Sequence, residues 1–166
     1  TTVRDLGTEG AGYADVGLKQ AIEQDIVAGP RMLVATRALV APGAYGPRGF
    51  EPGVVVPLGA EEAGGPDLVT AVRRQIAAGA DVVKLYADYR WGKGEPSRPT
   101  FTQAEMAAAV EAAHSAGRKV AAHAATDEGV RRAILAGVDT IEHGYEGSAA
   151  TFALMKAHNV GYCPTL

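Results

Sequence analysis

Apolar residues recur along the chain in an order that predicts alternating helices and strands. Between residues 65 and 79, Leu68, Val72 and Ile76 are spaced so that they share one face of a helix, which Gly79 ends. A short apolar run at residues 81–86 follows at once and is typical of a buried strand. This order repeats towards the end of the chain, and the sequence therefore predicts helices at 65–79, 104–116, 127–136 and 149–158.

Six strands are expected, and successive strands are mostly separated by a single helix. Strands joined in this way form right-handed crossovers, which produce a parallel sheet and an α/β fold. An open doubly wound sheet and a TIM-type (β/α)8 barrel both fit this order, and six strands would make an incomplete barrel. The chain, residues 1–166, is expected to form one domain. The strands are expected near residues 1–5, 31–36, 81–86, 118–123, 138–142 and 160–164.

Residues 37–64 interrupt the alternation. This stretch contains Pro42, Pro47, Pro52 and Pro57 together with several glycines, and its apolar residues show no period. We expect a long Pro- and Gly-rich loop between the second and third strands. Long loops in compact domains are often lids or substrate-binding segments, and a flexible insertion without a role explains the composition equally well.

Composition and charge exclude several classes of partner. Apolar residues make up 47% of the chain, charged residues 21%, and the net charge is −3 without a basic cluster. This balance argues against nucleic acid or an anionic membrane as the main partner, and no apolar run reaches the roughly 18 residues of a membrane span. Cys163 is the single cysteine, which excludes an internal disulfide and fits a reducing, cytoplasmic location.

Three chemically active side chains follow apolar runs at equivalent points of their strand–helix units: Lys84, His123 and His143. A lone histidine on a strand is more often a core or rim residue than a ligand. In a parallel barrel, however, the carboxyl ends of all strands converge on one mouth, so the three together predict a shared site.

The chemistry of these side chains favours a metal ion. Imidazole is a good ligand for Zn2+. A lysine can join a metal site only as the neutral amine or as an N-carboxylated lysine, whose two oxygens can bridge two ions. Burial in an apolar strand lowers the pKa of a lysine and so supplies the nucleophilic amine that carboxylation needs.

Several segments resemble the amidohydrolase superfamily, in particular its imidazolonepropionase-like and prolidase-like branch. The resemblance runs along nearly the whole chain, and the Ile-Glu-His-Gly segment in its Ala-Gly-Val context is the most specific part. The segments that carry it are Thr2 to Gly7, Gly29-Pro30-Arg31, Val82-Val83-Lys84-Leu85, Ala122-His123-Ala124, Ala136 to Gly144 and Pro164-Thr165-Leu166.

The resemblance implies a (β/α)8 barrel in which Lys84 is N-carboxylated and bridges two zinc ions, while His123 and His143 are ligands from the fifth and sixth strands. One zinc ion, or another divalent metal, is also compatible with these residues. The implied reaction is hydrolysis of an amide-type bond by a metal-activated water, with a carboxylate that passes a proton to the leaving amine. The implied substrates are small molecules such as dipeptides or acylated amino acids.

Parts of the family pattern have no counterpart in the sequence. The chain contains no His-x-His pair, which the family carries on its first strand, and neither the eighth-strand aspartate nor the small β-domain is found. We therefore interpret the chain as a central fragment that covers barrel strands two to seven. Activity is expected of the complete parent barrel, and the isolated fragment is expected to be inactive. The missing strands of the parent chain, or a second copy, would cover its open edges.

Other polar and aromatic residues are expected near the predicted site. Tyr86, Tyr89 and Arg90 follow the lysine strand and would rim the mouth, where they would contact substrate or remain solvated loop residues. By strand alternation, Glu142 is expected to point away from His143 and out of the barrel. Arg4 and Asp5 are expected to form a structural ion pair.

Two other functions remain open on the sequence. Lys84 would also suit an aldolase-like enzyme in which it forms a Schiff base with a carbonyl substrate, although His123 and His143 then share no purpose. The third reading is a truncated, non-catalytic barrel fragment.

Overall fold

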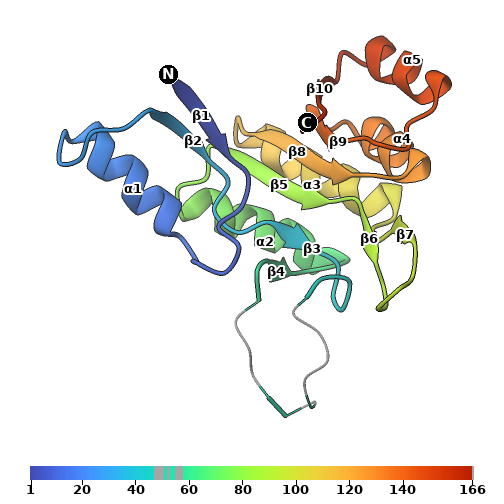
Figure 1. The fold of residues 1–166 in the computed structure, drawn as a ribbon, viewed down its shortest axis with the longest axis horizontal. Helices are drawn as coiled ribbons and strands as arrows, with labels where there is room; N and C mark the ends of the chain where they lie inside the picture. Colours follow the sequence, from blue (N-terminus) through green and yellow to red (C-terminus); the bar gives the residue numbers. More distant parts are fainter. Residues whose placement is uncertain (47–50, 52, 55–57, 166) are drawn as a thin grey trace.

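The computed structural model describes residues 1–46, 51, 53–54 and 58–165 (Figure 1). Strands and helices alternate along most of the chain. In order, the elements are β1 (Thr2–Asp5), α1 (Ala14–Glu23), β2 (Arg31–Val34), β3 (Leu39–Val40), β4 (Glu61–Glu62), α2 (Pro66–Ala77), β5 (Val82–Tyr86), β6 (Asp88–Arg90), β7 (Ser97–Pro99), α3 (Gln103–Ser115), β8 (Lys119–Ala124), α4 (Asp127–Ala136), β9 (Thr140–His143), α5 (Ala149–Ala157) and β10 (Gly161–Cys163).

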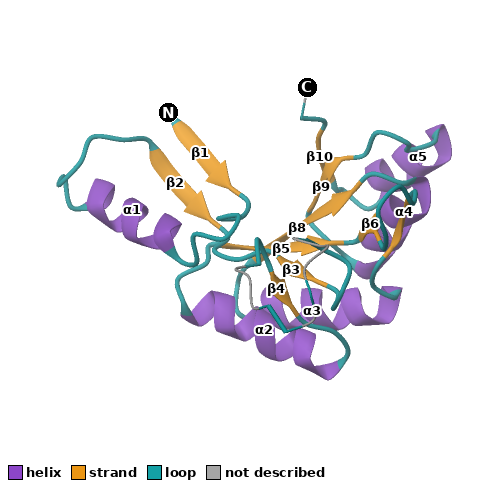
Figure 2. Ribbon diagram, turned by 60° about the horizontal axis from the view of Figure 1, so that its bottom comes forward, coloured by secondary structure: helices purple, strands orange, loops and turns teal. Residues whose placement is uncertain are grey.

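The main sheet is parallel, with the strand order β10-β9-β8-β5-β3-β4. Strands β1 and β2 form a separate parallel pair, and β6 and β7 form an antiparallel hairpin. Helices lie outside the sheets, while β1–β2 and β9–β10 rise on opposite sides of the central strands (Figure 2). All six expected strands are present, and the α/β class with part of a barrel is confirmed.

Side chains connect the separate pair β1–β2 to strand β9 of the main sheet across the concave side. Arg4 Nη2 on β1 lies 2.7 Å from Glu142 Oε1 on β9, and Arg4 Nη1 donates to Thr140 Oγ1 at 3.0 Å. The expectation that Glu142 points out of the barrel is therefore wrong, as is the expected pairing of Arg4 with Asp5. The alternation fails because β9 ends at His143 with a φ of +79°, so Glu142 and His143 both turn inward.

Capping residues set the ends of the helices. A capping box starts α3: Thr102 Oγ1 accepts from the Glu105 amide, and the Glu105 side chain accepts from the Thr102 amide. Thr126 caps α4, and Gly137 ends it in the left-handed conformation. These signals explain why the expected bounds of α4 match the observed ones.

The core lies between the outer face of the sheet and the helices. Alternate strand residues face it, so the residues between them, including Lys84 and His123, point to the concave side. A smaller apolar cluster of Ala35, Val82 and Ala121 lies on the same side. Val82 and Ala121 precede Lys84 and His123 by two residues on their strands. The main core contains Leu68 and Val72 of α2, Met106 and Val110 of α3, Val130 and Ile134 of α4, and Val83, Leu85, Val120 and Ile141 of the sheet.

The expected loop at 37–64 contains the two short strands β3 and β4, which extend the sheet beyond β5. Pro47, Pro52 and Pro57 lie outside the described residues, so the choice between a lid and an insertion stays a prediction. No helix in the described part of the chain is both long and apolar enough to cross a membrane.

Candidate metal centre

Lys84 is buried on the concave side of the central strand β5. Its side chain is 4% exposed, and its Nζ atom lies 5.5 Å from the centre of the Tyr86 ring. Among the described residues, no carboxylate lies within ion-pair distance of this nitrogen. Burial therefore lowers the pKa of Lys84 to about 8, which makes the neutral, nucleophilic amine accessible near neutral pH.

His123 and His143 come from neighbouring strands and meet next to this lysine. Their ring centres are 4.6 Å apart. Burial, followed by the charges of His143 and Lys84, lowers the pKa of His123 to about 3. Burial and the Lys84 charge also lower the pKa of His143. Both imidazoles are consequently neutral at pH 7, which is the form that binds a metal ion.

Each imidazole has one nitrogen occupied by a protein group. His143 Nδ1 lies 2.7 Å from Thr165 Oγ1 and 3.2 Å from the Tyr145 hydroxyl. His123 Nε2 lies 3.5 Å from Asp88 Oδ1. Metal-binding histidines commonly use one nitrogen for a metal and the other for a protein acceptor, and the contacts of both rings are compatible with this arrangement.

A cavity of about 440 Å3 opens beside these residues on the concave side. Lys84 and His143 both line it, and Arg4 and Glu142 close one wall with their ion pair. Its other lining residues are Leu6, Gly7, Glu9, Tyr86, Cys163 and Thr165.

The donors present suit a divalent cation but do not complete its coordination. Within the described part of the chain, His, Cys, Asp and Glu form no group of three that could hold a metal ion. The available set is two neutral imidazoles and the Lys84 amine, which becomes an oxygen donor only after carboxylation. A structural or catalytic zinc site uses at least three protein ligands, so the set fits with Lys84 included.

The three residues expected at the rim lie at different distances from the histidines. The Tyr86 ring stacks on His123 with 4.6 Å between centres, and Tyr89 lies 5.8 Å from the same imidazole. Arg90 is exposed and lines a neighbouring hollow together with Tyr89 and Lys93. The hairpin β6–β7, which sequence reasoning missed, holds Tyr89 and Arg90 in place.

Three further residues of this region were missed from the sequence. Tyr45 lies 5.1 Å from the Tyr86 ring and donates to Glu9 Oε2 at 2.7 Å, so both extend the aromatic wall. Asp88 is fully buried, and this burial raises the pKa of its carboxyl group. Asp88 lies two residues beyond the end of the lysine strand β5, and this closeness to the strand end is the signal in the sequence that points to it.

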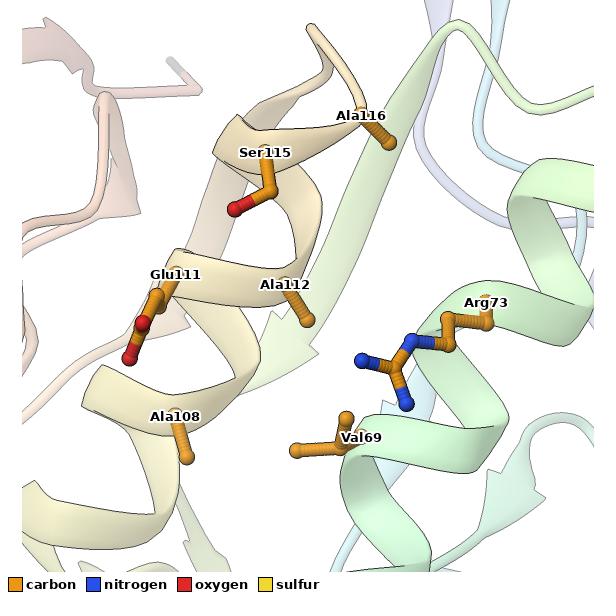
Figure 3. A pocket seen from close by; sticks show the side chains of 7 residues that line it. All are labelled: Val69, Arg73, Ala108, Glu111, Ala112, Ser115 and Ala116. Atoms are coloured by element: carbon orange, nitrogen blue, oxygen red, sulfur yellow. The ribbon is translucent and has the colours of Figure 1, made fainter.

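A second hollow, of about 400 Å3, lies between α2 and α3 and away from these residues (Figure 3). Val69 and Arg73 of α2 point towards α3, whose lining side chains are small apart from Glu111. This groove is lined by a single carboxylate, Glu111, and a single hydroxyl, Ser115, without an imidazole or a lysine. The side chains that could act together therefore lie on the concave side of the sheet.

Comparisons with known proteins show what the chain as a whole is similar to. The model of the amidohydrolase family matches residues 1–165. An uncharacterized protein of Mycobacterium tuberculosis is 33% identical over 137 residues, which cover 82% of this chain and 35% of that protein. The chain spans only about a third of the length of this curated relative.

Two solved structures extend the comparison. A Xaa-Pro dipeptidase with bound methionine in its active site is 34% identical, with a TM-score of 0.82. A prolidase complexed with N-methylphosphonate-L-proline has the same identity and the same TM-score. Each match covers 99% of this chain and 42% of the solved chain.

Proposed function

Because the chain belongs to the amidohydrolase family, we propose that the protein is a metal-dependent hydrolase that cleaves amide-type bonds in small substrates such as dipeptides or acylated amino acids. The observation that carries this proposal is the meeting of two neutral imidazoles, with ring centres 4.6 Å apart, beside a buried lysine that has no carboxylate partner among the described residues.

His123, His143 and Lys84 would hold the cation, with Lys84 in its N-carboxylated form. The low pKa of the lysine supports carboxylation, because only the neutral amine reacts with CO2. The carbamate would replace a buried positive charge by a negative one and so match a cation. When bound, a zinc ion or another divalent metal supplies an activated water and polarises the scissile carbonyl.

The aromatic wall supports a substrate site beside the metal ligands. Tyr86 and Tyr89 flank His123, and their rings would pack against an apolar part of a dipeptide. Arg90, farther out on β6, would bind a substrate carboxylate. The relatives named above were crystallised with methionine and with a proline phosphonate, which supports a small amino-acid-derived substrate.

The proposed site needs further groups. Three donors from this chain leave open at least one coordination position and provide no proton shuttle for the leaving amine. We therefore assign the activity to the whole protein that carries this chain, in which additional strands or a second copy would supply these groups.

Metal binding tests the proposal directly. The protein, produced at its full encoded length, should bind zinc in stoichiometric amount by calorimetry, and Lys84→Ala, His123→Ala and His143→Ala should each weaken binding by at least about tenfold. Matched controls are Lys156→Ala and His158→Ala, which alter exposed residues of α5 and its end. With 13C-bicarbonate, a carbamate signal should appear in the wild type and disappear in Lys84→Ala. Equal zinc binding by all variants contradicts the proposal.

The buried Lys84 also favours a second candidate, a Schiff-base enzyme of the aldolase type. Borohydride in the presence of a carbonyl substrate would then trap a covalent adduct at Lys84. The adjacency of His123 and His143, which has no role in this chemistry, supports the hydrolase instead.

A further inference from the structure

Asp88 is a buried carboxylate for which the proposed chemistry has no use. It begins β6, two residues beyond the end of β5, and its side chain is 0% exposed. Burial of a carboxylate costs free energy unless hydrogen bonds compensate it. Its partners therefore show what it does.

Most of these partners belong to the segment that joins β8 to α4. Asp88 Oδ2 accepts from the amides of Ala125 and Thr126, at 2.9 and 2.7 Å, and from Thr126 Oγ1 at 2.7 Å. Asp88 Oδ1 accepts from the Ala125 amide at 2.9 Å and lies 3.5 Å from His123 Nε2. The carboxylate thus connects the start of β6 to the segment before α4 by hydrogen bonds, and it lies beside the imidazole of His123.

A glycine leaves the space that this carboxylate occupies. A Cβ atom at Gly129 would lie 2.1 Å from Asp88 Oδ2 and 2.9 Å from Thr126 Oγ1. Gly129 lies inside α4, where glycine costs about 0.5–1 kcal/mol relative to alanine. Glycine at this position of α4 weakens the helix but leaves Asp88 its space.

We propose that Asp88 is a positioning residue for His123: it accepts a hydrogen bond from Nε2–H and so keeps the lone pair on Nδ1. This inference rests on the proposed metal site, because Nδ1 is then the nitrogen offered to the cation. A neutral imidazole has two tautomers, and the hydrogen bond made by one nitrogen selects which nitrogen is free. Both oxygens of Asp88 accept from amide or hydroxyl donors, which favours the ionised carboxylate. An ionised carboxylate only accepts, so the proton of the neutral imidazole would lie on Nε2.

Tautomer measurement tests the inference without any metal. Long-range 1H–15N NMR of the 15N-histidine-labelled protein at pH 7 should show His123 as the Nε2–H tautomer. In Asp88→Asn, whose amide can present N–H instead of an oxygen, that signal should change to a mixture or to the Nδ1–H form. An unchanged tautomer in Asp88→Asn overturns the proposal.

Zinc affinity gives a second readout. Asp88→Asn should weaken zinc binding by about 10–100-fold, the usual effect of removing the acceptor behind a ligating histidine. Gly129→Ala should act in the same direction, because its Cβ displaces the carboxylate while α4 itself gains helix propensity. This second variant keeps the test valid if Asp88→Asn does not fold.

Ser148→Ala is the control for a purely structural effect. Ser148 caps α5 by accepting from the Thr151 amide at 3.2 Å, and its loss should cost about 1 kcal/mol of stability without changing the His123 tautomer or zinc affinity. If the wild type and all variants bind no zinc, the proposed function fails, while the tautomer still tests Asp88. If zinc binds and Asp88→Asn changes neither readout, only the positioning role fails.

Discussion

The centre of the molecule and its N-terminal region are held together by different forces. In the centre, β5, β8 and β9 pack against α2, α3 and α4 through side chains that are almost completely buried. In the region of α1, β1 and β2, several large apolar side chains remain exposed, namely Val3, Leu18, Ile26, Val27 and Leu33. Apolar burial therefore stabilises the part that carries Lys84, His123 and His143 much more strongly.

Polar contacts attach the N-terminal region to the centre. Asp81, at the start of the β5 unit, accepts from the Val34 amide at 3.0 Å and pairs with Lys19 at 2.7 Å. Arg4 reaches Glu142 across the concave side. The positions of Lys84, His123 and His143 therefore depend on the packed centre, whereas the attachment of β1 and β2 to that centre depends on a few charged groups.

The largest effect is expected from Leu68→Ala in the centre. Leu68 is fully buried between α2 and the sheet, so its truncation removes apolar contacts and leaves a cavity. We expect a loss of about 2–5 kcal/mol in the free energy of unfolding, measured by urea denaturation. A loss below about 1 kcal/mol would mean that apolar burial does not stabilise the centre more strongly than the N-terminal region.

A smaller effect is expected from Arg4→Met, which breaks the main link across the sheet. Glu142 is 2% exposed and would lose its cation, while Arg4 is 29% exposed. Breaking a fully buried pair costs roughly 3–5 kcal/mol, and solvent near Arg4 reduces this to about 2 kcal/mol. Adding Glu142→Gln to Arg4→Met should restore part of the stability in the same assay. If the double variant is no better than the single one, the pair does not link the regions.

The same contrast explains what the sequence could predict. Local signals were sufficient for α4, because Thr126 and Gly137 mark its ends, and for the strands that carry Lys84 and His123. The pairing of Arg4 with Glu142 joins residues far apart in the chain, and no local pattern reports it. The inward turn of Glu142 depends on the positive φ of His143, which a strict strand alternation cannot anticipate. Asp88 was overlooked because its partners, Ala125 and Thr126, belong to another strand–helix unit.

A modest, pH-dependent effect is expected from Glu105→Gln, which tests the polar contacts inside the centre. Glu105 accepts from the amides of Thr102 and Gly65, at 2.9 and 2.8 Å, and so ties the start of α3 to that of α2. These hydrogen bonds lower the pKa of Glu105. The unfolded state therefore binds the proton more readily, and stability from this group is present above the unfolded pKa of about 4.3 and lost as pH falls through the folded value.

Glu105→Gln should thus reduce stability by about 1 kcal/mol at pH 7 and by less at pH 3.5, as followed by urea unfolding at both values. Glu111→Gln, at an exposed position of the same helix, is the matched control and should change neither. An equal loss at both pH values for Glu105→Gln would show that its charge has no part in the contact.

The smallest effect is expected from Leu18→Ala, the counterpart of Leu68→Ala in the N-terminal region. Both leucines lie within helices, but Leu18 is 49% exposed on α1. Its truncation removes little packing, and alanine is the better helix former, so a loss of about 0.5 kcal/mol is expected in the urea assay. A much larger loss of stability, especially one that grows with protein concentration, would show that this face is covered in solution. Light scattering would then detect association of the wild type. The exposed apolar side chains of α1, β1 and β2 would then belong to an interface, and the N-terminal region would be stabilised by apolar burial as the centre is.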